Sequence, residues 1–237
     1  MSSLPAHNAH RARRTAEGAE NYAKAIYQLQ GQGEGAVGTG AVAERLGVTP
    51  ASASAMLKRL ADDGLVEHAP YHGVRLTPDG EQLALEVIRH HRLIELFLAE
   101  VLGMPWDRVH DEAEVLEHHI SEELEELIAS KLGQPVRDPH GDPIPSRELD
   151  LAADDSVRLS ELEPGQSGCF ERVSDRDAEM LRYLDERGIH PGAELQVRRR
   201  EPFAGPMFVE VGGVTHALGG ELIERMRVSG VSDAAQT

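Results

Sequence analysis

The sequence predicts a mainly α-helical protein that ends in a small β domain. Three observations predict this fold class: helical hydrophobic periodicity up to about Lys131, a proline-rich linker after Gly133, and a β-rich pattern from Val157 onward. A chain of 237 residues favours more than one domain. We expect a flexible arm at 1–16, a winged helix-turn-helix at 17–78, a helical domain at 79–150, an SH3-like domain at 151–230 and a tail at 231–237.

The first third of the chain has the element order of a winged helix-turn-helix. A helix is expected at 17–30, and a glycine-rich loop follows it. Thr39 is expected to cap a short helix at 41–46. Thr49 is expected to cap a longer helix, Pro50–Asp62, whose proline occupies the first turn. Two extended segments, 65–69 and 73–77, then complete the motif as a hairpin wing.

The polar start of this longer helix is typical of a recognition helix. Small hydroxyl side chains suit base edges in a major groove, while lysine and arginine suit phosphates. The candidate DNA contacts are Thr49, Ser52, Ser54, Lys58 and Arg59 on the helix, and Tyr71 and Arg75 in the wing. Small helical hairpins with a polar face also occur without binding anything. The helix before this pair and the hairpin after it favour the DNA-binding interpretation.

Charge is distributed unevenly along the chain. The net charge is −17, yet residues 1–80 hold 8 basic and 8 acidic residues, whereas residues 81–150 hold 6 and 17. The neutral first third leaves room for a DNA-binding face, and the acidic remainder repels phosphate. Because there is no long basic stripe, affinity for DNA would have to come from a symmetric dimer.

The most informative segment is rich in acids and histidines. If one helix runs from about Trp106 to Lys131, one stripe of it holds His110, Glu114, Glu117 and His118. The opposite stripe is apolar and holds Val109, Ala113, Leu116, Ile120, Leu124 and Leu127. Like charges three and four residues apart repel each other, so a divalent cation is expected to compensate the two glutamates. An acidic face that only serves solubility is the alternative.

The preceding long helix, expected from Thr77 to about Leu102, adds a second pair of candidate ligands. His91 and Glu95 lie four residues apart and share a face. If the two helices are antiparallel, one site would use Glu114, Glu117 and His118, and the other would use His91, Glu95 and His110. Oxygen donors with one or two imidazoles suit Mn²⁺ or Fe²⁺ better than they suit metals that favour sulfur.

Two other classes of protein fit the sequence less well. A carboxylate-bridged metalloenzyme prefers two Glu-x-x-His pairs on separate helices; the metal-site helix has no such pair, and the zincin motif His-Glu-x-x-His is absent. A regulator that senses an organic ligand would need an apolar pocket, and an aromatic content of 4% argues against a large one. We therefore expect neither enzyme activity nor an organic cofactor.

The carboxyl-terminal part has the number and spacing of strands of a small SH3-like barrel. Strands are expected near 168–173, Glu194–Arg200, Met207–Val211 and 225–228, with a helix at 177–186. Cys169 is the single cysteine, which excludes an internal disulfide framework and a multi-cysteine zinc site. No signal peptide or run of about 18 apolar residues is visible, so we expect a cytoplasmic protein without a membrane segment.

Four motifs resemble those of a known family. They are Glu20-Asn21-Tyr22-Ala23-Lys24-Ala25-Ile26-Tyr27, His91-Arg92-Leu93-Ile94-Glu95, His110-Asp111-Glu112-Ala113-Glu114 with Glu117-His118, and Pro139-His140-Gly141-Asp142-Pro143-Ile144-Pro145. From Glu20 to about Val228, the chain resembles the diphtheria-toxin-repressor family of metal-dependent transcriptional regulators. The resemblance implies a winged helix, a helical dimerisation and metal-binding domain, an SH3-like domain, and a homodimer that binds double-stranded operator DNA.

The resemblance also implies two metal sites. The primary site would use Asn21, Glu114, Glu117 and His118, and the ancillary site His91, Glu95, His110, Glu171 and Asp175. Asp138 is a weaker candidate, because some manganese-type relatives have a cysteine ligand there. Iron-type members have cysteine at the place of Glu114, which therefore indicates the manganese-responsive branch, similar to manganese transport regulators. Asn21 departs from both branches, and Ala55 stands where the family has a recognition-helix glutamine.

The function that this resemblance implies is repression of metal-uptake genes with Mn²⁺ as the co-repressor. An Fe²⁺-responsive repressor of the same family is the alternative, with other divalent transition metals able to act in vitro. From another class, the alternative is the carboxylate-bridged metalloenzyme.

Overall fold

The computed structural model describes residues 4–31, 35–69, 73–203 and 205–233, and only the backbone of residues 4–15. The chain divides into two compact units. The first contains the residues up to His90 together with Glu117–Ile120 and Pro145–Asp150, and the second contains His91–Leu116, Ser121–Ile144 and the residues from Leu151 onward. None of the helices in the described ranges is long and apolar enough to cross a membrane.

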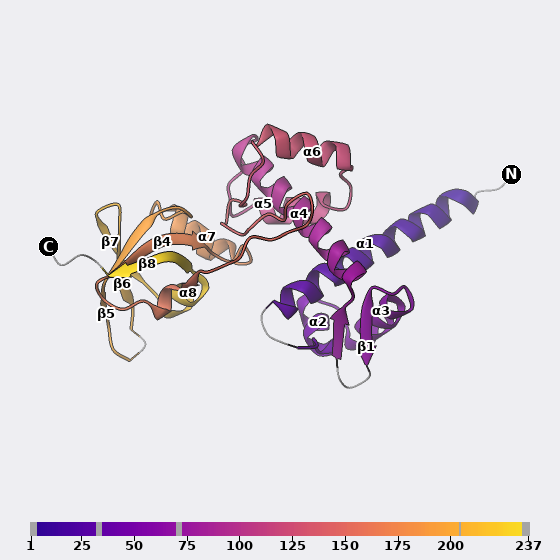
Figure 1. The fold of residues 1–237 in the computed structure, drawn as a ribbon, viewed down its shortest axis with the longest axis horizontal. Coiled ribbons are helices and arrows are strands. Elements are labelled where there is room, and N and C mark those ends of the chain that lie inside the picture. The colour runs from indigo at the N-terminus through magenta and orange to yellow at the C-terminus, as the bar shows by residue number, and fades with distance from the viewer. Residues whose placement is uncertain (1–3, 32–34, 70–72, 204, 234–237) are drawn as a thin grey trace. The chain divides into compact units, whose positions relative to one another are not determined.

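The first unit has the predicted winged helix-turn-helix (Figure 1). Its elements are α1 (Leu4–Gln30), α2 (Thr39–Arg45), α3 (Pro50–Asp62), β1 (Val66–Ala69) and β2 (Gly73–Leu76). The two strands are antiparallel and pair Val66 with Leu76. Apolar residues from every element share one core, including Ile26, Val42, Leu57, Leu60, Val66 and Val74. The predicted cap of α3 is confirmed, because the Thr49 hydroxyl accepts a hydrogen bond from the Ser52 amide at 3.2 Å.

Two details of this unit differ from the predictions. We expected a flexible arm over 1–16, but α1 begins at Leu4 and runs without interruption to Gln30. The segment is rich in alanine and arginine, which are among the strongest helix formers, and this accounts for the longer helix. We also expected Thr39 to cap the second helix, but Thr39 is its first residue and Gly38 occupies the cap position.

The predicted single helix from Trp106 to Lys131 is wrong. After α4 (Pro78–Glu100), the chain forms two separate helices, α5 (Val109–Leu116) and α6 (Glu122–Lys131). The Ser121 hydroxyl accepts a hydrogen bond from the Leu124 amide at 3.3 Å and so caps a new helix. His110 and Glu114 therefore lie on α5, whereas Glu117 and His118 follow its end. The expected apolar stripe is also broken, because Leu116, Leu124 and Leu127 are exposed.

The carboxyl-terminal part of the second unit is a six-stranded antiparallel sheet with strand order β3-β8-β4-β5-β6-β7 (Figure 1). Its elements are β3 (Val157–Arg158), the 3-10 helix η1 (Leu159–Glu161), β4 (Gln166–Arg172), α7 (Ala178–Asp185), β5 (Glu194–Arg200), β6 (Met207–Val211), β7 (Val214–Leu218), α8 (Gly220–Arg225) and β8 (Arg227–Asp233). The bounds of β5 and β6 match the prediction, whereas β3, β7 and α8 were not predicted.

The core of this sheet includes one residue from well outside it. Its buried residues include Phe170, Leu181, Leu195, Val209 and Val228, and also Trp106, which precedes α5. Trp106 is the only tryptophan of the chain and is 9% exposed. It therefore connects the core of the sheet with the helical part of the same unit.

Candidate metal centres

A buried ion pair occupies the centre of the first group of candidate ligands. The Lys24 ammonium on α1 lies 2.7 Å and 2.8 Å from the two carboxylate oxygens of Glu117, just after α5. Both residues are buried, with 7% of the Lys24 surface and 1% of the Glu117 surface exposed. A charge-paired contact of this kind satisfies two groups that would be costly to bury alone. With Glu20 and His118, and with Asn21 because of its position next to Glu20 on α1, we call this group the Lys24 cluster.

His118 is oriented within the Lys24 cluster by Glu20. The imidazole Nδ1 lies 2.5 Å from Oε2 of Glu20, and Nε2 lies 3.4 Å from Oε1 of Glu117. Because a carboxylate can only accept a hydrogen bond, Nδ1 donates, and Nε2 keeps its lone pair when the ring is neutral. Burial by itself lowers the pKa of His118, but its hydrogen bond to Glu20 and the charge of Glu117 outweigh burial and raise it.

Two polar atoms of the Lys24 cluster are suited to a cation. Within the described part of the chain, Asn21 Oδ1 and His118 Nε2 are buried and have no hydrogen-bond partner. Buried polar atoms are nearly always paired, so two unpaired ones indicate a missing ligand. On α1, Lys24 follows Glu20 by four residues and Asn21 by three. Helical spacing therefore places the three side chains on one side of the helix. An amide oxygen, an imidazole nitrogen and the carboxylate of Glu117 fit a hard divalent cation.

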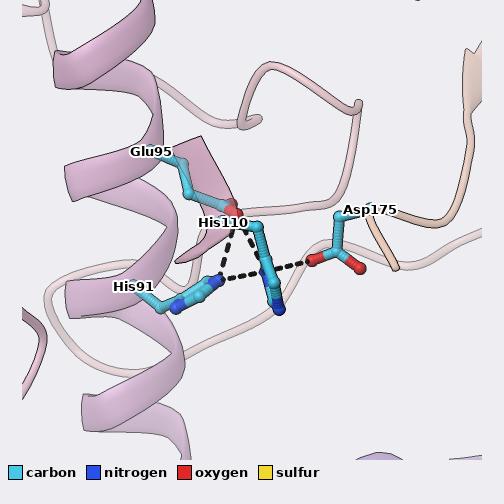
Figure 2. Close-up of side chains that lie close together, drawn as sticks. All are labelled: His91, Glu95, His110 and Asp175. Carbon is cyan, nitrogen blue, oxygen red and sulfur yellow. Dashed lines mark hydrogen bonds and ion pairs between the residues drawn. The ribbon is translucent and has the colours of Figure 1, made fainter. Parts of the chain in front are cut away.

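A second group of side chains, which we call the Glu95 cluster, lies in the second unit (Figure 2). It consists of His91 and Glu95 from α4, His110 from α5, and Asp175 between β4 and α7. Oε1 of Glu95 lies 3.0 Å from Nε2 of His91 and 3.3 Å from Nδ1 of His110, which lies 3.0 Å from Asp175. The four ligand atoms lie within 4.8 Å of one another, close enough to share one ion.

In the Glu95 cluster, carboxylates and imidazoles stabilise each other in their charged forms. Burial raises the pKa of Glu95, but the neighbouring His91, His110 and His140 outweigh burial and hold it well below its usual range. Burial lowers the pKa of His110, but Asp175 and Glu95 raise it to about 10. In the absence of metal, the cluster therefore holds protons where a divalent cation could supply the positive charge.

Sequence reasoning missed His140, which extends the Glu95 cluster. Its Nε2 lies 2.8 Å from the Trp106 carbonyl oxygen, so this nitrogen donates and Nδ1 faces Oε2 of Glu95 at 3.8 Å. Both of these facing atoms are buried without a hydrogen-bond partner among the described residues. Asp138 lies next to them and can share an ion with Glu95 and His140. His140 lies in the Pro139–Pro145 motif, which carries part of the family resemblance, but the sequence does not predict it as a ligand.

The loop that carries Asp138 and His140 is rigidly built. Oδ1 of Asp138 accepts hydrogen bonds from the amides of His140 and Asp142, at 2.8 Å and 2.9 Å. Gly141 has a φ of 89°, and a side-chain carbon there would lie only 1.9 Å from the Glu171 carbonyl oxygen. Only glycine fits this position, which holds the loop against β4. Burial, and next the charges of Glu95 and Asp142, raise the pKa of Asp138 well above its usual range.

One predicted ligand, Glu171, is not part of these arrangements, and another, Glu114, lies at the edge of the Glu95 cluster. Glu171 accepts a hydrogen bond from Ser229 at 2.6 Å and pairs with Arg137, so its carboxylate is used within the β domain. Glu114 lies on α5 with Oε1 3.8 Å from Nε2 of His110, at the edge of the Glu95 cluster. Of the ancillary set, the structure thus brings together His91, Glu95, His110 and Asp175, but not Glu171.

The predicted DNA contacts lie on the surface of the winged helix. Thr49, Ser52, Ser54, Lys58, Arg59 and Arg75 are all exposed. Arg59 is also within 3.6 Å of Asp63 one turn later. Tyr71 lies outside the described residues. The start of α3 therefore presents the small polar surface that the sequence predicts, with Ala55 exposed among these residues.

Comparisons with known proteins give a consistent result. Three family models match in series: the iron dependent repressor N-terminal DNA binding domain at residues 14–74, the iron dependent repressor metal binding and dimerisation domain at 77–146, and the FeoA domain at 157–230. The iron-dependent repressor IdeR of Mycobacterium tuberculosis strain H37Rv is 33% identical over 225 residues, which cover 90% of this chain and 96% of that protein.

Solved structures extend the comparison. A manganese-dependent transcriptional repressor in complex with manganese has a TM-score of 0.82 and 41% identity, covering 89% of this chain and 98% of the other. The manganese regulator SloR has a TM-score of 0.70 and 30% identity, covering 91% and 98%. These relatives are transcriptional repressors and not enzymes, so the metalloenzyme alternative is excluded.

Proposed function

This chain belongs to the diphtheria toxin repressor family of metal-dependent transcriptional repressors, and on that premise we propose that Mn²⁺ is its co-repressor and that its dimer represses metal-uptake genes. The observation that carries the choice of metal is the donor set. Among the described residues, both clusters offer only oxygen and nitrogen atoms, and Cys169 lies apart on β4. Hard donors with one or two imidazoles favour Mn²⁺ and Fe²⁺ over metals that prefer sulfur.

In this proposal, Asn21, Glu117 and His118 hold the primary ion, and the family resemblance adds Glu114 to this set. His91, Glu95, His110 and Asp175 hold the ancillary ion, with His140 and Asp138 beside them. When bound, the metal supplies positive charge that offsets the repulsion among these carboxylates. The residues then favour the conformation that binds DNA, and the metal shifts the population toward it.

An exposed apolar surface of the second unit supports the dimer. Among the exposed large hydrophobic residues are Val101, Leu102, Val115, Leu116, Leu124 and Leu127, which follow α4 or lie on α5 and α6. Large apolar side chains that stay exposed are candidates for an interaction surface in a soluble protein. Two copies joined here would present two α3 helices to double-stranded operator DNA, with the hydroxyl residues of each helix against base edges.

The test is metal-dependent binding of operator DNA. Purified protein stripped of metal would be titrated with Mn²⁺, anaerobic Fe²⁺ and Zn²⁺ in the presence of promoter fragments from its own genome. We expect saturable DNA binding to appear at lower concentrations of free Mn²⁺ than of free Fe²⁺. Tighter activation by Fe²⁺ would assign the chain to iron-dependent repression, and equal DNA binding without metal would overturn the co-repressor mechanism.

A matched pair of variants makes this test specific. His118→Ala removes a proposed primary ligand and should abolish the response of DNA binding to Mn²⁺. His119→Ala changes the neighbouring exposed histidine and should leave the response intact. A response that survives His118→Ala would remove the Lys24 cluster from the mechanism.

A further inference from the structure

The Lys24 cluster already contains a cation of its own. The Lys24 ammonium bonds both oxygens of Glu117, although the two residues are 93 positions apart in the sequence. The side chains are 9% and 0% exposed, so water cannot easily replace either partner. An ammonium on one carboxylate, held at both oxygens, occupies the same lone pairs that a divalent cation would use.

The surroundings of this pair distinguish Lys24 from an ordinary structural lysine. Asn21 Oδ1 and His118 Nε2 are buried without hydrogen-bond partners in the described ranges, yet Lys24 is directed to Glu117. The ammonium thus bonds one candidate ligand, while two other polar atoms stay without a hydrogen-bond partner among the described residues, which is the arrangement expected of an incomplete substitute for a metal ion.

We propose that Lys24 is an internal competitor that sets the affinity of the Lys24 cluster for divalent metal. This inference rests on the proposed function, because it assigns Glu117 as a metal ligand. In the metal-free protein, Lys24 holds Glu117; coordination by Glu117 requires that the ammonium release at least one carboxylate oxygen. Lys24 is therefore an affinity-determining residue and not a ligand.

The consequence for affinity follows from a simple equilibrium. If only a fraction of molecules have Glu117 released, the apparent dissociation constant equals the intrinsic constant divided by that fraction. A buried, doubly bonded pair keeps this fraction small. Removing the ammonium while keeping the length and apolar stem of the side chain should therefore strengthen metal binding, even though it lowers the stability of the metal-free protein.

The experiment measures Mn²⁺ affinity in a His110→Ala background, which disables the Glu95 cluster. Free Mn²⁺ would be followed by its electron paramagnetic resonance signal in full-length protein. We expect Lys24→Met to bind Mn²⁺ at least tenfold more tightly than the background. Lys24→Arg keeps the positive charge and should bind no more tightly than the background. Unchanged or weaker binding by Lys24→Met would overturn the proposal.

A second measurement separates competition from a simple loss of structure. In urea unfolding without metal, Lys24→Met should be less stable than the background, and saturating Mn²⁺ should raise its stability by more than it raises that of the background. If Lys24→Met does not fold without metal, Lys24→Gln provides the same comparison. A background protein that binds no Mn²⁺ would overturn the proposed function itself, whereas binding that Lys24→Met leaves unchanged would overturn only the role of Lys24.

Discussion

The Lys24 cluster and the Glu95 cluster contain similar donors but balance their negative charge differently. In the Lys24 cluster, a lysine ammonium lies directly on the buried carboxylate of Glu117. In the Glu95 cluster, the four residues are two histidines and two carboxylates, so the positive charge comes from protonated imidazole. Asp175 and Glu95 raise the pKa of His110 to about 10. The Lys24 ammonium has to move away from Glu117 before a metal can bind there. In the Glu95 cluster, the histidines only have to lose their protons.

This difference between the clusters predicts that the chain responds to metal at two different concentrations. In the proposed function, binding at the Glu95 cluster would exchange protons for a cation, and the four ligand atoms of the side chains in Figure 2 already lie within 4.8 Å of one another. Binding at the Lys24 cluster would require the buried Lys24 ammonium to release at least one of the two Glu117 oxygens that it bonds. We therefore expect the Glu95 cluster to bind metal at lower concentrations than the Lys24 cluster does.

The largest expected effect comes from the same substitution made in each cluster of the metal-free protein. Glu117→Gln leaves Lys24 as a buried cation without its carboxylate, and breaking such a pair costs about 3–5 kcal/mol. Glu95→Gln leaves imidazoles that can lose their protons and become neutral, so we expect a loss of only about 1–3 kcal/mol. Urea unfolding in the presence of a chelator measures both values.

Glu112→Gln on the exposed surface of α5 serves as the control for this pair and should change the stability by less than about 0.5 kcal/mol. Equal losses for Glu117→Gln and Glu95→Gln would show that the two clusters balance charge in the same way. The comparison would then fail, and the proposed role of Lys24 would lose its physical basis.

A smaller effect should appear in the fluorescence of Trp106. Its ring stacks on that of His140, with centroids 5.7 Å apart and planes at 21°, and His140 faces Glu95. Because Mn²⁺ is paramagnetic, its binding to the Glu95 cluster should quench the emission of this single tryptophan. His110→Ala should abolish the quenching and His118→Ala should preserve it. The reverse pattern would assign the emission change to the other cluster.

The smallest effect concerns the support of the loop beside the Glu95 cluster. Burial by itself raises the pKa of Asp154, but hydrogen bonds from Ser156 and Arg172 outweigh it and lower the pKa to about 2. Arg172 also bonds Asp142 in that loop at 3.1 Å. The carboxylate therefore stabilises the folded state above its unfolded pKa near 3.8, and this stabilisation is lost as the pH falls toward 2.

Asp154→Asn tests this contribution through thermal unfolding at several pH values. The variant should be slightly less stable than the wild type at pH 5–7. The difference should shrink as the pH falls from about 4 toward 2, because the unfolded wild-type chain takes up a proton at Asp154 in this range before the folded protein does. A difference that stays constant down to pH 2 would mean that the ion pair with Arg172 does not stabilise the loop.

The sequence predicted local structure well where capping and periodicity operate within a few residues. Thr49 and Pro50 set the start of α3, and alternation set the bounds of β5 and β6. His91, Glu95 and His110 were predicted as one group because helical spacing places the first two on one face. Asp175 was added from the resemblance and lies with them.

Long-range pairing could not be predicted in this way. Nothing in the local sequence indicates that Lys24 bonds Glu117, because the contact depends on how α1 meets the segment after α5. The break between α5 and α6 was not predicted because the hydrophobic pattern continues through it. The local signal for the break is Ser121, which caps α6. His140 was missed because its role depends on the Trp106 carbonyl and on Glu95, neither of which is near it in the chain.

The position of Trp106 has a consequence for how this protein unfolds. A boundary drawn at residue 150 would separate the β domain from one of the large side chains in its own core. A fragment that begins there would expose the surface that the indole covers and would lack its full complement of apolar contacts. The helical part of this unit and its β sheet should therefore melt in one cooperative transition, and a fragment of residues 151–237 would be a poor independent module.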